Sequence, residues 1–390
     1  MKKNNFLIFF ISITFFTCSK GQIIKEASAQ EFTQLYPQTE VLEWIKSYSF
    51  NFKPYPILQE YAQEKFPHQI TFNDMYILKI PDATAYFCNY SLWGINGFIF
   101  INNYFIKENQ IKCISPFYLD KTDTIEVPDS LTEISIDDSV AICSHLYPDC
   151  YGHFILDVLC QLALLEIHNV EYDYLCIPYQ SKFMKEALEL WGIPEEKIIP
   201  LNFNLSIQAK NIIFPTSTTQ TTNIYLGVNY SHPFLIEYVK NKLLQGAIKK
   251  GSSINQLPKK IFISRKDSPK RCLPNEDKIF EIFEKYGFKK YEFSKLTLTD
   301  QIMLCNSAQE IAAPIGSGSC NIIFCSPKTK YIEISSTVID ATFFFLADIF
   351  NLNYYNINNS SPDDFNNGPW TQPSVFPIEK IKDFFNENDV

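Results

Sequence analysis

The sequence lacks the motifs that mark several classes of enzyme. It contains no Gly-x-Gly-x-x-Gly fingerprint, which a dinucleotide-dependent epimerase would need. It also has no His-Glu-x-x-His, no Cys/His cluster with zinc spacing and no Asp-x-Asp of the kind that holds Mg2+ beside a diphosphate. The acidic pair Asp363-Asp364 lies in a polar stretch and is interpreted as surface. The sequence therefore predicts neither a metal site nor a bound cofactor.

Positive charge is scarce as well. The chain has 34 Lys and Arg residues against 43 Asp and Glu, a net charge of -9. A nucleic-acid-binding protein would need a basic face to displace counterions, so that class of partner is excluded. Apolar residues make up 46% and charged residues 20%, which is typical of a globular protein. With 390 residues, the chain exceeds the roughly 250–300 residues of a single hydrophobic core, and two domains are expected.

The apolar run near the N-terminus, Phe6 to Thr17, is short. It follows Lys2 and Lys3 and precedes Cys18, which is the layout of a signal peptide. A helix rising 1.5 Å per residue over this run is too short to cross a hydrocarbon core of about 30 Å. Residues 1–20 are therefore predicted to be a signal-like segment. Export is favoured, membrane contact through residues 6–17 is the alternative, and a cytoplasmic location stays open.

The patterning along the chain predicts the α/β class with two doubly wound, Rossmann-like domains. Residues 21–139 contain short apolar runs broken by Pro, Asn and Asp, typical of an antiparallel β-rich annex. From residue 140 onward, strand-sized and helix-sized segments alternate, which indicates βαβ units and parallel sheets. The polar, aperiodic stretch 246–259 predicts a linker. The expected domains are thus 140–248 and 259–350, followed by a tail, 351–390, that packs back.

Local signals place the individual elements. Gly192 and Pro194 end one predicted helix, Pro233 starts another, and Thr297 with Asp300 forms a capping-box-like start. The predicted helices are 152–168, 181–191, 233–244, 276–286, 298–306 and 378–385, and the predicted strands are 141–144, 174–177, 198–201, 211–214, 260–264, 290–293, 310–313 and 330–334.

The first candidate site opens the helix predicted from residue 152. His153, Asp157 and Gln161 are spaced four apart, so they fall on one face of an otherwise apolar helix. A solvated face would also explain three polar residues, but such faces usually carry Lys and Glu. Since His153 or Asp157 at the mouth of a parallel sheet can take a proton from a hydroxyl, both are predicted to be catalytic, in the role of a general base.

The second candidate site directly follows the strand predicted over 260–264. Arg265 and Arg271 lie in the basic stretch from Ser264 to Arg271. Doubly wound sheets bind ligands at the carboxyl ends of their strands, and the arginine fork matches phosphate oxygens. A solubilising loop would explain the charge but not its position. Both arginines are therefore predicted to bind a diphosphate.

The third candidate site is the loop from Ala313 to Asn321, between a strand and a short apolar helix. Gly316, Ser317 and Gly318 allow backbone N–H groups to approach an anion at a helix N-terminus. Taken alone, such a loop is a weak signal, because tight turns often need glycine. Glu333, at the end of the next strand, is predicted to bind a ribose hydroxyl, with an exposed carboxylate as the alternative.

The three motifs together resemble the catalytic domain of glycosyltransferase family 61. The similarity covers about Val140 to Ile334. The matching residues are Gly152, His153 and Asp157; Ile263-Ser264-Arg265, Arg271 and Asn275-Glu276; and Pro314, Gly316, Gly318 and Asn321.

This resemblance implies a GT-B fold, a UDP-sugar donor bound mainly by the second domain, inversion at the anomeric carbon and no metal. It adds Asn275, Glu276 and Asn321 to the donor-binding set, and it implies a glycan or protein hydroxyl as acceptor. Many relatives carry His where this chain has Ile315. The alternative hypothesis is therefore a non-catalytic member that binds a sugar or a nucleotide sugar, and another nucleotide-sugar enzyme ranks last.

Overall fold

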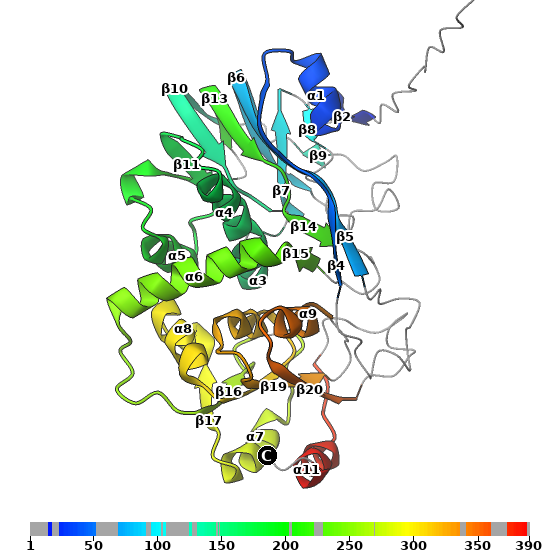
Figure 1. Cartoon of the computed structure of the whole chain (residues 1–390), viewed down its shortest axis with the longest axis vertical. Coiled ribbons are helices and arrows are strands. Elements are labelled where there is room, and N and C mark those ends of the chain that lie inside the picture. The colour runs from blue at the N-terminus through cyan, green and yellow to red at the C-terminus, as the bar shows by residue number, and fades with distance from the viewer. Residues whose placement is uncertain are drawn as a thin grey trace, which may run out of the picture.

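The computed structural model describes residues 15–17, 23–51, 69–90, 95–102, 104–106, 125–126, 131–145, 147, 149–202, 205–221, 229–268, 270–335, 341–359 and 373–387. These residues form two β-sheets, each with helices packed against it, stacked along the long axis of the molecule (Figure 1). The α/β class predicted from the sequence is confirmed. Most of the N-terminal apolar run lies outside the described residues, and no helix in the described part is long and apolar enough to cross a membrane.

The first sheet combines antiparallel and parallel strands in one hydrogen-bonded layer. Its main order is β1-β2-β8-β7-β6-β13-β10-β11-β12, with β3 and β9 also paired to β6. Strands β13, β10, β11 and β12 are parallel, whereas the long strand β6 runs antiparallel to β13. The strands are β1 Phe15–Thr17, β2 Ile23–Ala27, β3 Glu40–Ile45, β6 Met75–Tyr90, β7 Ile95–Ile101, β8 Tyr104–Ile106, β9 Ile125–Glu126, β10 Thr132–Ile142, β11 Tyr174–Ile177, β12 Ile198–Pro200 and β13 Leu205–Pro215.

This topology differs from the separate β-rich annex that the sequence suggested. Most strands before residue 132 do pair antiparallel, with β2 and β8 as a parallel pair, but β6 joins them to the parallel strands through ten residue pairs with β13. The predicted boundary at 139/140 falls inside β10. The physical reason is that an edge strand with unpaired backbone groups is stabilised by adding a neighbour, and β6 supplies one to β13. Two small hairpins, β4 (Tyr48–Asn51) with β5 (Gln69–Phe72) and β14 (Thr219–Thr221) with β15 (Asn229–Ser231), lie beside this sheet.

The helices of the first half are α1 (Ala29–Leu35), α3 (Tyr151–His153), α4 (Leu159–Ile167), α5 (Lys182–Trp191) and α6 (Pro233–Lys250). Helix α5 ends where predicted, because Gly192 adopts φ 91°, a left-handed conformation that glycine tolerates best. Helix α6 continues six residues past its predicted end, so the predicted linker 246–259 is helical up to Lys250. Polarity alone did not mark the end of this helix.

Gly246, within α6, allows this helix to pack closely on α5. A Cβ atom at this position would lie 2.2 Å from the carbonyl oxygen of Leu190. We therefore expect Gly246→Ala to lower the free energy of unfolding by about 1–3 kcal/mol, although alanine is intrinsically favoured in a helix by about 1 kcal/mol. Chemical denaturation would measure the loss. The exposed neighbour Gln245 serves as control, and Gln245→Ala should change stability by less than about 0.5 kcal/mol.

The second sheet is parallel throughout, in the order β17-β16-β18-β19-β20. This is the 2-1-3-4-5 order of a doubly wound sheet, in which ligands bind beyond the carboxyl ends of the strands. The strands are β16 Lys260–Ser264, β17 Lys289–Glu292, β18 Glu310–Pro314, β19 Lys330–Ser335 and β20 Asn353–Asn358, and the helices are α7 Glu276–Lys285, α8 Leu298–Ser307, the 3-10 helix η6 Ser317–Phe324, α9 Ala341–Ile349 and α11 Ile378–Glu387. In the C-terminal tail, α11 packs on α7 with Phe385 stacked against Tyr286 at 3.8 Å.

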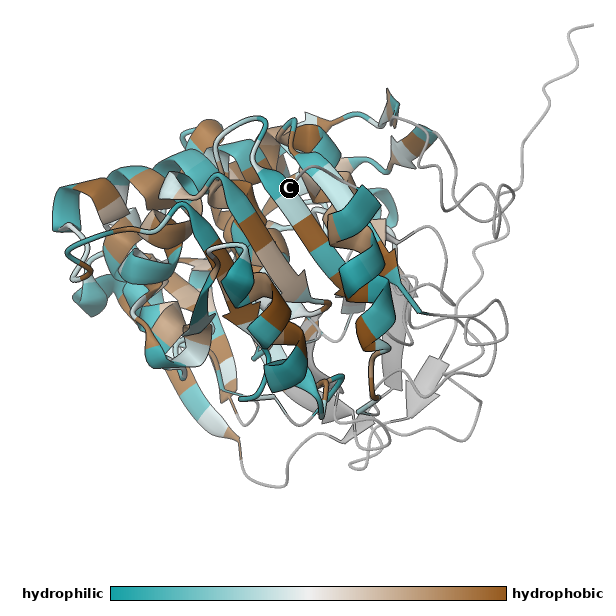
Figure 2. Cartoon of the chain, turned by 90° about the horizontal axis from the view of Figure 1, so that it is seen from below, coloured by the Kyte–Doolittle hydropathy of each residue, from teal (hydrophilic) through white to brown (hydrophobic). Residues whose placement is uncertain are grey.

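A continuous apolar core joins the two halves. One cluster of buried side chains includes Ile213 of β13, Leu243 of α6, Leu304 of α8 and Ile311 of β18. Helix α6 crosses the middle of the molecule and contacts α8 and η6 (Figure 1). Seen from the end of the second sheet, the helices turn largely hydrophilic surfaces outward (Figure 2). The edge at which the strands of both halves end is therefore held in a fixed arrangement by burial of apolar surface.

Candidate active site

The first motif forms an irregular helix start. A π-helical turn, η2 (Phe154–Val158), connects α3 to α4. Such single turns of π-helix occur frequently at functional sites. His153 and Asp157 face each other across this turn, as predicted, with 2.8 Å between the histidine Nδ1 and the carboxylate Oδ2. The third residue of the predicted face, Gln161, instead bonds the backbone of Ser144 and Pro215 and ties the ends of β10 and β13 together.

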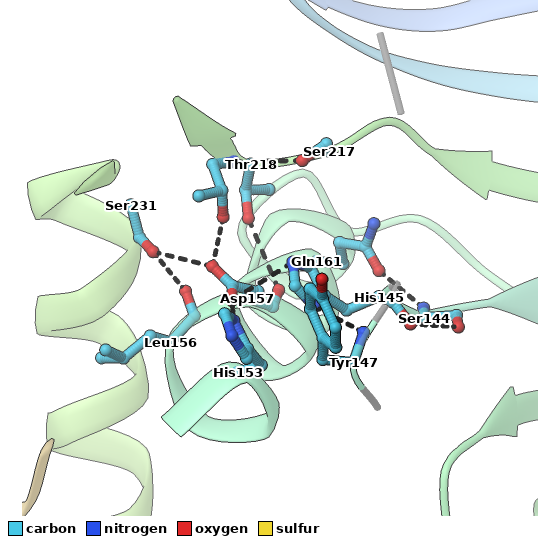
Figure 3. A network of polar contacts seen from close by, with 11 residues as sticks. Ser144, His145, Tyr147, His153, Leu156, Asp157, Gln161, Ser217, Thr218 and Ser231 are labelled. Atoms are coloured by element: carbon cyan, nitrogen blue, oxygen red, sulfur yellow. Dashed lines mark hydrogen bonds and ion pairs between the residues drawn. The ribbon is translucent and has the colours of Figure 1, made fainter. Parts of the chain in front are cut away.

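Asp157 is buried, and its carboxylate oxygens bond neighbouring side chains (Figure 3). Its Oδ1 accepts hydrogen bonds from the hydroxyls of Thr219 and Ser231, the latter at 3.2 Å. Burial raises the pKa of the carboxyl, but His145, His153 and the Thr219 bond together outweigh this effect, and the pKa is lowered. Asp157 is thus an ionised group that orients its neighbours. Its side chain is only 5% exposed, whereas that of His153 is 23% exposed, so His153 is the more accessible of the two groups.

His145 is a member of the site that the motif analysis missed. Its Nδ1 accepts a hydrogen bond from the backbone N–H of Tyr147 at 3.1 Å, so the neutral ring carries its proton on Nε2. That Nε2 lies 3.5 Å from the Oδ2 of Asp157. Burial lowers the pKa of His145 to about 3, with His153 acting in the same direction and Asp157 opposing, so the ring is neutral. Its position directly after the predicted strand 141–144 was a signal that could have identified it.

The imidazole of His153 packs against two other rings, which also contact each other at 6.1 Å. The centroid of His145 is 4.4 Å away with an interplanar angle of 18°, and that of Tyr147 is 5.3 Å away at 27°. Asp157 fixes Nδ1, so the lone pair of the neutral ring is on Nε2. The side chain is 23% exposed. His153 is therefore an imidazole that Asp157 orients and that is partly accessible, as in side chains that serve as a general base.

His145, His153 and Asp157 also have the composition of a metal site, and their ligand atoms lie within 4.8 Å of one another. The geometry does not fit a shared ion. A metal binds in the plane of an imidazole ring, and two stacked rings 18° from parallel do not direct their lone pairs at one point. The proton on His145 Nε2, required by the bond that its Nδ1 accepts, also occupies the lone pair that an ion would need.

Arg265 packs directly on the third motif. A Cβ atom at Gly316 would lie 1.7 Å from Nη1 of Arg265, so only glycine leaves room for the guanidinium here. Arg265 and Arg271 are the only two arginines in the chain. Burial and Arg271 lower the pKa of Arg265, to about 10, which leaves it charged at neutral pH. The structure thus brings together the arginine loop and the glycine loop, as the sequence predicted.

The glycine loop in turn lies on the start of the first motif. The Oγ of Ser317 is 3.5 Å from the Sγ of Cys150, the residue before α3. A Cβ atom at Gly152 would lie 3.0 Å from the Sγ of Cys320. Gly318 packs near Ile263, at the end of β16. The three motifs, at residues 152–157, 264–271 and 313–321, therefore converge on one site.

Four predicted donor ligands are buried or bonded within the protein. Glu276 is fully buried; one oxygen accepts from Ser264 Oγ at 2.6 Å and the other from the backbone N–H of Arg265 at 2.8 Å. The amide of Asn275 bonds both backbone groups of Phe376. Glu276 therefore positions Arg265, and Asn275 anchors the tail. Direct contact of either residue with the donor stays a prediction, and both already have hydrogen-bond partners within the protein.

Asn321 and Glu333 are buried as well, each 1% exposed. Asn321 accepts a hydrogen bond from the Tyr151 hydroxyl at 2.7 Å and thereby links η6 to α3. Glu333 accepts from Ser335, Tyr354 and Asn356. These bonds, all to Oε1 of Glu333, hold β19 and β20 together, and the ribose contact of Glu333 stays a prediction. Ile315, where many relatives carry His, is 3% exposed and belongs to the core.

Two buried histidines make the fold sensitive to acid. The pKa of His145 and that of His232 are each lowered to about 3, mainly by burial, whereas an unfolded histidine titrates near 6.5. Between these values the unfolded chain binds more protons, so the free energy of unfolding falls as the pH decreases from about 6.5. We expect a loss of about 1.4 kcal/mol per pH unit for each residue, measured by denaturant unfolding between pH 7 and pH 5.

The matched variant is His232→Phe, since His232 already packs on Phe72 at 4.2 Å. This substitution removes one titrating group and should abolish about half of the acid sensitivity over that range. An unchanged slope would show that His232 is not neutral in the folded protein.

The comparison with known families agrees with the motifs that converge here. Residues 151–332 match the sequence model of the family described as Glycosyltransferase 61, so the chain contains a glycosyltransferase family 61 domain, and the resemblance drawn from the three motifs is confirmed. A search of curated proteins gives no match.

Proposed function

We propose that the protein transfers a hexose or pentose from a nucleotide sugar, UDP-linked by family resemblance, to a hydroxyl of a glycan or protein acceptor. The observation that carries this proposal is the placement of His153. Its Nδ1 is held by Asp157, and its side chain is partly exposed at the start of the helix on which the Arg265–Gly316 loops converge.

Proton transfer to Nε2 of His153 would activate the acceptor hydroxyl. The hydroxyl oxygen attacks the anomeric carbon as the bond from that carbon to the diphosphate oxygen breaks, so the sugar inverts its configuration. The carboxylate of Asp157 stabilises the imidazolium that forms, as a buried aspartate does in other His–Asp pairs. Asp157 is thus a positioning residue in this proposal and His153 the base.

The departing diphosphate would be neutralised by fixed groups of the second half. Arg265 supplies a charged fork and Arg271 lies in the same loop, while the start of η6 at Gly316 packs on the Arg265 guanidinium and would add backbone N–H groups. No group in this scheme requires an ion, which supports a mechanism without metal.

The arrangement of the sheets supports a GT-B architecture with the donor on the second half. Both halves contain parallel strands, and the second has the doubly wound order whose carboxyl edge binds ligands. The first half, which carries His153, would then receive the acceptor. The only support for a membrane or secretory location is the signal-like N-terminal segment.

The second candidate function is a non-catalytic member that binds a sugar or nucleotide sugar. Ile315 favours it, because a buried isoleucine offers no polar group where relatives have histidine. The two functions differ in one observable: both predict donor binding, and only the enzyme predicts turnover.

Thermal shift of the purified protein against nucleotides and nucleotide sugars, without added metal, is the first test. Stabilisation by UDP or a UDP-sugar, lost in Arg265→Ala, is the expected result. Release of UDP in the presence of an acceptor then separates the enzyme from the binding protein. If no nucleotide stabilises a well-folded sample, the proposal of a nucleotide-sugar donor is wrong.

A further inference from the structure

In the described part of the chain, the strongly exposed aromatic side chains lie in the first half of the molecule. Among the described residues, three aromatic side chains are more than a third exposed: Trp44 at 47%, Phe234 at 38% and Tyr147 at 36%. The described part of the second half, from residue 259 onward, has none. Single exposed apolar side chains are common on protein surfaces, so it is the position of these rings relative to the site that is informative.

Tyr147 lies beside the proposed base. Its ring stacks on His153 with centroids 5.3 Å apart, and it follows β10 in the same loop as His145. A molecule that presents a hydroxyl to Nε2 of His153 would therefore meet the exposed surface of this ring.

Phe234 is connected to Asp157 through the start of α6. It sits in the first turn of α6, three residues after Ser231, whose hydroxyl bonds the carboxylate of Asp157. Its ring contacts those of His232 at 5.8 Å and Tyr48 at 6.4 Å, and the Tyr48 hydroxyl is 3.0 Å from His232 Nδ1. The Phe234 ring is thus fixed by its two neighbouring rings, and the Tyr48 hydroxyl is a polar group close to it.

Trp44 is an exposed but immobilised indole. Its ring stacks on Tyr76 at 5.9 Å with an interplanar angle of 16°, and its Nε1 donates to Asp74 at 2.8 Å. Tyr76 pairs with Trp44 across β3 and β6, and its backbone bonds Thr216 at the end of β13. Gln161 connects that end of β13 to Ser144 and hence to the start of the loop that carries His145.

These links place Trp44 at the same sheet edge as the catalytic loop. Strand β3 is separated from β10 by β6 and β13, which makes three strand spacings or about 14 Å. Tyr76, on which Trp44 stacks, packs in the core on the face of the sheet opposite α4. His153 precedes α4, so a ligand in contact with both Trp44 and His153 must pass over the ends of the strands. A chain of several sugar units has the necessary length.

We propose that Tyr147, Phe234 and Trp44 form an acceptor site for an oligosaccharide, with Tyr147 beside the reacting sugar and Trp44 at a distal sugar. This inference rests on the proposed function and selects a glycan over a protein acceptor. One face of a sugar ring presents C–H groups that pack on an aromatic ring, while its edge carries hydroxyls for hydrogen bonds. The three rings are separate and have polar groups nearby, which suits a chain of sugar units that offers one C–H face per unit.

The test uses the full chain and defined acceptors: oligosaccharides of two and of six glucose, xylose or mannose units, and peptides rich in Ser and Thr. Calorimetry gives their affinity, and UDP release gives turnover. We expect Tyr147→Ala and Phe234→Ala to weaken binding of both lengths of the accepted sugar about 5-fold or more, and Trp44→Ala to weaken only the six-unit chain to that extent. Val41→Ala is the matched control, since Val41 lies on the same strand and is 46% exposed.

Stabilisation by the donor nucleotide should be unchanged in all four variants, which separates this inference from the proposed function. Oligosaccharide affinities that do not respond to Trp44→Ala or Phe234→Ala overturn the site. Binding of peptides with no binding of any oligosaccharide overturns the choice of acceptor but leaves the donor site intact. Failure of every nucleotide to bind would instead contradict the proposed function.

Discussion

Replacing His153 with alanine is expected to lower turnover by about 10²- to 10⁴-fold while donor binding is retained. The reason is that the variant removes the group that takes the acceptor proton and leaves the arginine and glycine loops intact. The measurement is kcat with saturating donor and acceptor, together with the thermal shift produced by the nucleotide. Because the His153 side chain is 23% exposed and sits at a helix start, the fold should tolerate the change.

His168 provides the matched control. It lies at the other end of the same helical segment, its side chain is 24% exposed, and it pairs with Glu43 rather than with Asp157. His168→Ala should leave kcat unchanged. Asp157→Asn should also reduce kcat and spare donor binding, since it removes the charge that orients His153. Equal activity of His153→Ala and the parent protein would show that another group accepts the proton.

Replacing Arg265 with alanine is expected to weaken binding of the donor nucleotide by about 10- to 150-fold. This range corresponds to the loss of hydrogen bonds to a charged group, about 1.5–3 kcal/mol. Titration calorimetry with the nucleotide that gives the largest thermal shift would measure it. Gly316→Ala should act in the same direction, because a methyl group would occupy the position of the guanidinium.

The neighbouring cation Lys266 is the control for charge alone. Its side chain is 44% exposed and forms an ion pair with Asp277, away from Gly316. Lys266→Ala should change nucleotide affinity by less than about 2-fold, since exposed charges are screened by solvent. If both variants lose affinity equally, the loop acts through its net charge and not through the fork of Arg265.

Several predictions succeeded because they depend on local chemistry. The Gly192 stop and the Thr297 cap are decided within a few residues, and both are found in the structure. The three motifs also converge, as expected for segments that follow the carboxyl ends of strands in doubly wound sheets. The arginine and glycine loops follow neighbouring parallel strands, β16 and β18, so their contact follows from the topology.

Roles of buried polar residues could not be assigned in this way. Asn275, Glu276, Asn321 and Glu333 have the residue types of donor ligands, but each is engaged by protein groups that the sequence places far away or in an unforeseen geometry. A carboxylate or amide can satisfy its hydrogen bonds with a ligand or with the protein, and only the surrounding packing decides between them.

The sequence by itself determined the α/β class, most helices and strands, and the segments that make up the site. Those features follow from periodicity, caps and glycine positions, which act over short distances. The tertiary structure decided that β6 joins the N-terminal strands to the parallel sheet, that His145 completes the His153–Asp157 pair, and which of the polar motif residues stay accessible. These outcomes depend on contacts between residues distant in the chain, where burial and the need to pair every buried polar group determine the result.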